Sequence, residues 1–187
     1  FIVHADIYDD FKARLKTSFD ALVIGDPLLP STDIGPLVNG DAKTEILRQV
    51  DTAISAGAMR VTGGHDIEGP GYYVSPGILE NIPKGSDAYH EEIFGPIALL
   101  FKVESLDQAL DVANDSPFGL GGAIFTQNKG EQERAISELE AGATFVNSMT
   151  SSNPLLPFGG IKRSGYGREL AAEGIRTFCN IKTVSIA

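Results

Sequence analysis

Apolar residues spaced four apart predict two amphipathic helices in the first third of the chain. The first covers residues 7–18, where Ile7, Phe11 and Leu15 share one face. The second covers residues 41–56 and ends before a glycine, a residue that commonly stops a helix. Shorter helices are predicted over residues 105–114, 130–139 and 168–176.

Short apolar runs between these helices predict strands at residues 1–3, 59–62, 97–101, 122–125, 143–146 and 181–186. The run at residues 97–101 is continuously apolar, which is typical of a strand buried on both faces of a parallel sheet. Strands and helices alternate from residue 97 to residue 146. We therefore predict an α/β fold with a mainly parallel, doubly covered sheet. The strand at residues 181–186 has no neighbour in sequence and is expected to pair with another chain.

Composition narrows the function further. The chain has 187 residues and a net charge of −10, and such a surface repels phosphate backbones and anionic lipids. We therefore expect no nucleic-acid partner and no membrane. The single cysteine, Cys179, cannot form an internal disulfide, which fits the reducing cytoplasm. Three scattered histidines give no spacing suited to a metal site.

A loop of about twenty residues follows the strand at 143–146, and ordered loops of this length are usually functional. It covers residues 147–166 and is rich in hydroxyl side chains and glycines. The glycines lack the preceding strand and the spacing of a dinucleotide-binding motif. We interpret them as positions where the backbone needs a positive φ or a close approach.

Two acids and an aromatic residue stand directly before the strand at 97–101, in the segment Glu-Glu-Ile-Phe-Gly-Pro of residues 91–96. A carboxylate there can accept hydrogen bonds from both hydroxyls of a ribose, and a phenyl ring can support a flat heterocycle. From the residues alone, a solvated turn with Phe94 in the core is the favoured interpretation.

Three segments together resemble the aldehyde dehydrogenase superfamily, in its C-terminal, catalytic and oligomerisation portion. They are residues 91–96, the Pro-Phe-Gly-Gly of residues 157–160, and the Ser-Gly-Tyr-Gly-Arg-Glu of residues 164–169. They occur in family order, and the closing residues 178–184 are most similar to bacterial succinate-semialdehyde dehydrogenases.

The resemblance implies roles for four residues. Glu92 would bind the ribose of the nicotinamide, Phe94 would pack near it, and the cofactor would be NAD or NADP. Phe158 would flank the substrate, and Ser152, six residues earlier, would meet the carboxylate of succinate semialdehyde. No catalytic residue is expected in this chain, because the family's reactive cysteine, glutamate base, asparagine and coenzyme domain precede the segment that matches Phe1.

Cys179 is not expected to be that nucleophile. It lies near the end of the last predicted helix, where the helix dipole disfavours a thiolate. We expect it to be a small buried hydrophobic residue.

The resemblance also implies a division of the chain. Residues 1–166 would form the catalytic α/β domain without its nucleophile segment, and residues 167–187 the final helix and oligomerisation strand. We expect a homo-oligomer through that strand, a small aldehyde as substrate, and no activity of the isolated chain. Two alternatives remain, a non-catalytic oligomerisation or binding module derived from this fold, and a reductase of acyl or acyl-phosphate groups.

Overall fold

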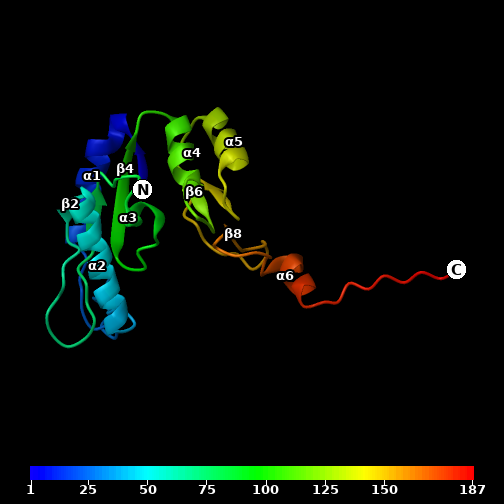
Figure 1. Ribbon diagram of the computed structural model, residues 1–187, viewed down its shortest axis with the longest axis horizontal. Coiled ribbons are helices and arrows are strands. Elements are labelled where there is room, and N and C mark those ends of the chain that lie inside the picture. Colours follow the sequence, from blue (N-terminus) through cyan, green and yellow to red (C-terminus); the bar gives the residue numbers. More distant parts are fainter. The chain divides into compact units, whose positions relative to one another are not determined.

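A four-stranded sheet with the order β1-β4-β3-β2 is the centre of the first of two units in the computed structural model, which describes residues 1–187 (Figure 1). This unit is Phe1–Ala109, and the second is Leu110–Ala187. The strands of the sheet are β1 (Ile2–His4), β2 (Met59–Thr62), β3 (Gly77–Glu80) and β4 (Ile97–Val103). The helices beside them are α1 (Ala5–Asp20), α2 (Gly40–Ala56) and α3 (Asp87–His90).

The core of the first unit lies on both sides of β3. Ile78 and Leu79 are adjacent and fully buried, yet they belong to different clusters. Leu79 packs with Val50 of α2, whereas Ile78 packs with Tyr8 of α1. Because successive side chains of a strand point to opposite faces, α1 and α2 lie on opposite faces of this sheet.

Helix α1 turns a different residue inward from the one that its periodicity predicted. Ile7 is 58% exposed, whereas Tyr8 is 4% exposed. The Tyr8 hydroxyl donates a hydrogen bond of 2.8 Å to Glu80 Oε2, and Lys12 Nζ lies 3.0 Å from the same oxygen. Burial and the contact with Glu80 raise the pKa of Tyr8 above its ordinary value. A phenol with a partly buried acceptor therefore takes this point of the core in place of an isoleucine.

The second unit contains two small sheets. Strand β6 (Gly122–Ile124) runs parallel to β7 (Thr144–Val146), and β5 (Phe118–Gly119) runs antiparallel to β8 (Ile161–Lys162). Its helices are α5 (Lys129–Glu138) and α6 (Ala171–Thr177), and α4 (Leu106–Asn114) crosses the division between the units. The hydroxyl of Ser105 accepts a hydrogen bond from Gln108 N, as expected of a residue that caps α4.

The α/β class is confirmed, but the sheet is mixed. β1, β4 and β3 are parallel, whereas β2 pairs with β3 in the antiparallel direction. The strands of residues 97–146 do not form one ladder, because β4 pairs with β1 and β3 while β6 pairs with β7. Alternation along the sequence predicts the strands themselves, but their partners depend on distant residues.

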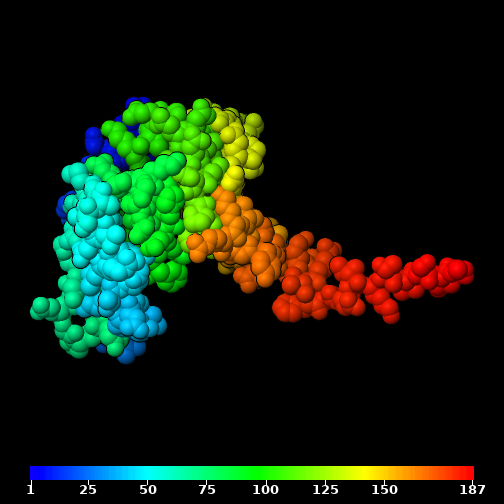
Figure 2. Space-filling view, viewed as in Figure 1, coloured from blue at the N-terminus to red at the C-terminus, as the bar shows by residue number.

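The predicted strand at residues 181–186 is absent. Residues 180–187 have no regular secondary structure, and Figure 2 shows them in red as a narrow extension beyond α6. Ile181 and Ile186 are more than 90% exposed. A strand needs a neighbouring backbone, and none of this chain lies beside the tail, so pairing with another chain stays a prediction. No helix in the structure combines the length and the hydropathy that a membrane span requires.

Candidate functional site

The segment of residues 91–96 connects α3 to β4 and presents an acid and an aromatic ring at its surface. The carboxylate of Glu92 is exposed and makes no hydrogen bond or ion pair within the chain. Phe94 is 82% exposed. The alternative in which Phe94 belongs to the core is therefore wrong for this structure. A free carboxylate and an uncovered ring two residues apart suit a ribose diol and a flat heterocycle.

Residues of helix α2 contact this segment and fix its position. Gln49 Nε2 donates to Glu91 Oε2 over 3.1 Å and to the carbonyl oxygen of Glu92 over 3.4 Å. Gly95 lies so close to α2 that a β-carbon on it would stand 2.3 Å from Ile46 Cδ1. Only glycine permits this approach without displacing the isoleucine. The segment is thus fixed to α2 at both ends, while Glu92 points its carboxylate into solvent.

Gln49 was missed by the sequence analysis. It is 8% exposed and lies among the buried residues of α2, Ile46, Val50 and Ala53. A glutamine three residues after Ile46, on the apolar stripe of an amphipathic helix, is the signal that could have identified it. Buried polar side chains are hydrogen-bonded, so such a glutamine predicts a polar partner on a neighbouring segment.

The long loop after β7 begins with an asparagine in the left-handed region. Asn147 has φ 52°, and its side chain both donates to the Thr126 carbonyl oxygen and accepts from the Thr126 amide, each over 2.9 Å. Beyond the last residues of the β6–β7 ladder, the Asn147 side-chain amide therefore pairs with the Thr126 backbone in place of a backbone peptide group. The backbone itself is free to turn away, and the direction of the loop is set at this residue.

The end of the same loop folds back on itself. Phe158 and Glu169 exchange two backbone hydrogen bonds of 2.9 and 2.8 Å. A β-carbon on Gly160 would lie 2.4 Å from Ser164 Cβ, so the predicted role of these glycines in close backbone approach is confirmed. The loop contains β8, and it is therefore partly ordered by pairing with β5.

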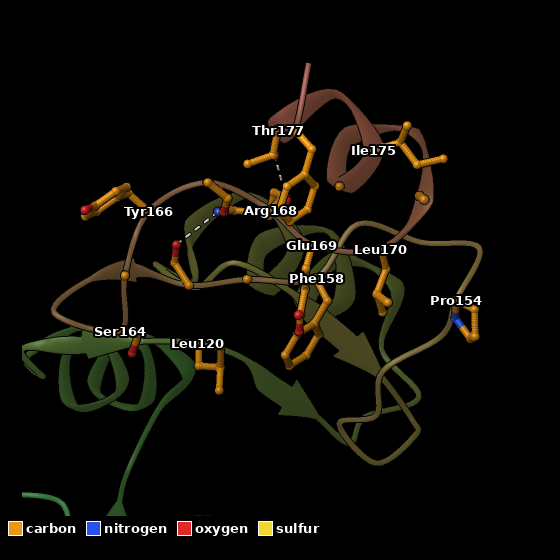
Figure 3. Close-up of a pocket in the computed structure, with 17 residues that line it drawn as sticks. Leu120, Pro154, Phe158, Ser164, Tyr166, Arg168, Glu169, Leu170, Ile175 and Thr177 are labelled. Atoms are coloured by element: carbon orange, nitrogen blue, oxygen red, sulfur yellow. Dashed lines mark hydrogen bonds between the residues drawn. The ribbon is translucent and has the colours of Figure 1, made fainter. Parts of the chain in front are cut away.

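A pocket of about 790 Å³ lies between this loop and α6 (Figure 3). Phe158 lines it, and Arg168 braces its wall by donating from Nη1 to the Gly160 carbonyl oxygen over 3.0 Å. Tyr166 points away from the pocket and is fully exposed. Ser152 is exposed and is not part of the lining. The two residues that the sequence analysis assigned to the substrate therefore do not share this pocket.

Cys179 lies just beyond α6. Its thiol is exposed and donates a weak hydrogen bond of 3.5 Å to the carbonyl oxygen of Ile175. The expectation of a buried cysteine was wrong, because α6 has no element packed over this side. The thiol forms no hydrogen bond with a histidine or a carboxylate base, and the Cys179 amide donates to the Arg176 carbonyl oxygen.

The fold is thus that of an α/β protein with an exposed acid–aromatic segment before β4 in its first unit and a glycine-rich loop after β7 in its second. The sequence profile of the aldehyde dehydrogenase family matches residues 1–184, and the chain belongs to that family.

Individual relatives agree with the family match. The chain is 50% identical over 184 residues to "Succinate-semialdehyde dehydrogenase [NADP(+)] 1" of Mycobacterium ulcerans, covering 98% of this chain and 40% of that protein. The crystal structure of succinic semialdehyde dehydrogenase from Streptococcus pyogenes, in complex with NADP+, superposes with a TM-score of 0.94 at 43% identity. That match covers 100% of this chain and 41% of the other.

A more distant structure has the same fold. Apo betaine aldehyde dehydrogenase from Staphylococcus aureus gives a TM-score of 0.90 at 29% identity, over 95% of this chain and 36% of that one. The chain therefore spans about two fifths of the length of the relatives that it matches.

Proposed function

We propose that this chain is the C-terminal, catalytic and oligomerisation portion of an NADP-dependent succinate-semialdehyde dehydrogenase. The observation that carries the proposal is the 50% identity, over 98% of the chain, to a protein of that name. The overall reaction converts the aldehyde, water and NADP+ into the carboxylic acid, NADPH and a proton. The coenzyme, when bound, supplies the acceptor for the hydride.

In this proposal the chain contributes binding surfaces, and the nucleophile comes from elsewhere in the protein. The family's chemistry requires a cysteine thiolate that adds to the aldehyde and carries the acyl group until water releases it. Cys179, the single cysteine here, is exposed beyond a seven-residue helix and contacts only backbone carbonyls of that helix. No base that could activate its thiol is hydrogen-bonded to it.

Glu92 and Phe94 are proposed to bind the nicotinamide end of the coenzyme. The free carboxylate of Glu92 can accept from the two ribose hydroxyls, and the exposed ring of Phe94 can pack against the adjoining part of the coenzyme. NADP+ is proposed in preference to NAD+ because the mycobacterial relative is named for NADP+ and the streptococcal structure contains it.

Ser152 and Phe158 are proposed to face the aldehyde. Both belong to the loop that Asn147 directs, and the exposed hydroxyl of Ser152 is free to donate to a substrate carboxylate. The residues of the tail support a further proposal. Ile181, Val184 and Ile186 are at least 70% exposed, and we propose that they pair with a second copy as an oligomerisation strand.

Steady-state kinetics of the full-length protein and of the 187-residue chain test the proposal together. The full-length protein should reduce NADP+ with succinate semialdehyde, and the isolated chain should show no turnover. Turnover by the isolated chain would overturn the assignment of the nucleophile. A full-length protein that binds nucleotide or assembles but oxidises no aldehyde would favour a non-catalytic module.

A further inference from the structure

Gln49 is the only buried side chain whose polar group reaches the segment of residues 91–96. Ser86, the other buried polar residue, donates instead to the carbonyl oxygen of Pro83. A buried amide is stable only when its donors are paired, and Gln49 Nε2 finds both of its acceptors on Glu91 and Glu92. The position of this amide and the path of the acidic segment are therefore coupled.

The two hydrogen bonds from Gln49 leave Glu91 and Glu92 with their carboxylates in different surroundings. Glu91 turns its carboxylate towards α2, where Gln49 lies 3.1 Å away and Arg48 Nη2 lies 3.7 Å away. At Glu92 it is the carbonyl oxygen that accepts from Gln49. Fixing the carbonyl of Glu92 orients its peptide plane, and successive side chains of an extended segment point to opposite sides. The Glu92 carboxylate is thereby left in solvent.

We propose that Gln49 is a positioning residue for coenzyme binding, which acts by orienting Glu92 through the Glu91 carboxylate and the Glu92 carbonyl. This inference rests on the proposed function, in which Glu92 binds the ribose. Ile46 lies one turn earlier on the same face of α2, and its contact with Gly95 sets how closely the segment approaches the helix. Helix α2 thereby determines where the surface at Glu92 lies.

A double-mutant cycle in the full-length protein tests this coupling, with NADP+ affinity measured by titration and the KM values for NADP+ and succinate semialdehyde by kinetics. Gln49→Leu should raise the Kd and KM for NADP+ by about 3- to 10-fold, because Glu92 would no longer be held in the orientation that meets the ribose. The KM for the aldehyde should change less than about 2-fold. In the Glu92→Ala background, Gln49→Leu should change the Kd for NADP+ no further, because it acts through the residue already removed.

The outcomes are distinct. A Glu92→Ala variant with unchanged NADP+ affinity would overturn the proposed function, and the inference with it. Two further outcomes would overturn the inference alone, provided that Glu92→Ala weakens NADP+ binding. In the first, Gln49→Leu leaves the NADP+ affinity unchanged. In the second, Gln49→Leu weakens NADP+ binding equally in the wild-type and Glu92→Ala backgrounds. Gln108→Leu is the matched control, since its amide oxygen accepts from Glu104 N, away from the acidic segment. If Gln49→Leu does not fold, Gln49→Asn keeps a buried amide but withdraws it from both acceptors, and the same pattern is expected.

Discussion

The two units of the chain differ in how completely they bury their own apolar residues. In the second unit, Leu110 and Ala135 are the only buried hydrophobic residues, and all the others lie in the first. Large apolar side chains of the second unit are widely exposed, for example Leu155 at 83% and Phe178 at 93%. The first unit has a core of its own, whereas the second has apolar surface to be covered by other parts of the protein or by another copy.

This difference separates the two halves of the proposed site. The acid–aromatic segment is held against α2 in the unit with the buried core, so its geometry is defined within this chain. The loop of residues 147–166 and the tail belong to the unit that lacks such a core. In the proposed full-length protein, we expect their final arrangement to depend on the part that would match the remaining three fifths of the relatives. The chain therefore defines the proposed coenzyme surface better than the proposed substrate surface.

The largest effect on stability is expected from truncating a core residue of the first unit. Leu79→Ala should lower the free energy of unfolding by about 2–5 kcal/mol, because Leu79 is fully buried against α2. Leu155→Ala, at an exposed position of the second unit, should change it by less than about 0.5 kcal/mol. Urea unfolding of the isolated chain measures both. Equal losses would mean that Leu155 is buried in solution and would remove the contrast between the units.

Ser152→Ala tests the substrate half of the site. A hydrogen bond to a charged carboxylate contributes about 1.5–3 kcal/mol, so the KM of the full-length protein for succinate semialdehyde should rise about 10-fold or more. The KM for an uncharged aliphatic aldehyde should stay the same. Ser151→Ala is the control at the neighbouring position. An equal rise for both aldehydes would exclude recognition of the carboxylate by Ser152.

Asn147→Ala should loosen the start of the long loop at residues 147–166. It removes both side-chain bonds to Thr126 and places an alanine at φ 52°, at a cost of about 1–3 kcal/mol. Hydrogen exchange at the Thr126 amide should accelerate, while amides of β3 should be unchanged. Asn147→Gly separates the two causes, because it removes the side chain but tolerates the conformation. Unchanged exchange at Thr126 in both variants would show that the loop is held elsewhere.

The smallest expected effect is a change in the pH dependence of stability at alkaline pH, caused by Tyr8. Burial and Glu80 raise the pKa of Tyr8 in the folded state above its ordinary value of 10.0. The unfolded chain then loses the proton first, so this contribution to stability is complete below about pH 10 and is lost as the pH rises further. Tyr8→Phe should make the fall in stability between about pH 9 and pH 11 less steep. Tyr166→Phe, at a fully exposed position, should leave it unchanged.

Local patterns in the sequence predicted most of the elements. The α1, α2, α4 and α5 helices and the β1, β2, β4, β6 and β7 strands lie within a few residues of the predicted ranges. Strands β5 and β8 were missed. Each has only two residues, which is too short for a detectable periodicity, and the two strands form only by pairing with each other. The tail was predicted as a strand from its apolar residues, but composition cannot supply the neighbouring backbone.

The candidate site was predictable to a similar extent. Glu92 and Phe94 were selected through the family resemblance, because the residue pattern alone favoured a solvated turn. Gln49 could not be connected with them, because 43 residues separate it from Glu92 and its role depends on the packing of α2. The division at residues 166/167 and the roles of Ser152 and Phe158 stay predictions, since they concern the assembled protein.

Hydrogen exchange of the isolated chain and of the full-length protein tests the contrast between the units most directly. We predict that amides of β3 and β4 are equally protected in both, because Leu79 and Leu100 are buried within the chain itself. Residues 147–187 should gain protection only in the full-length protein. Equal protection of residues 147–187 in both samples, or loss of protection of β3 in the isolated chain, would contradict the account.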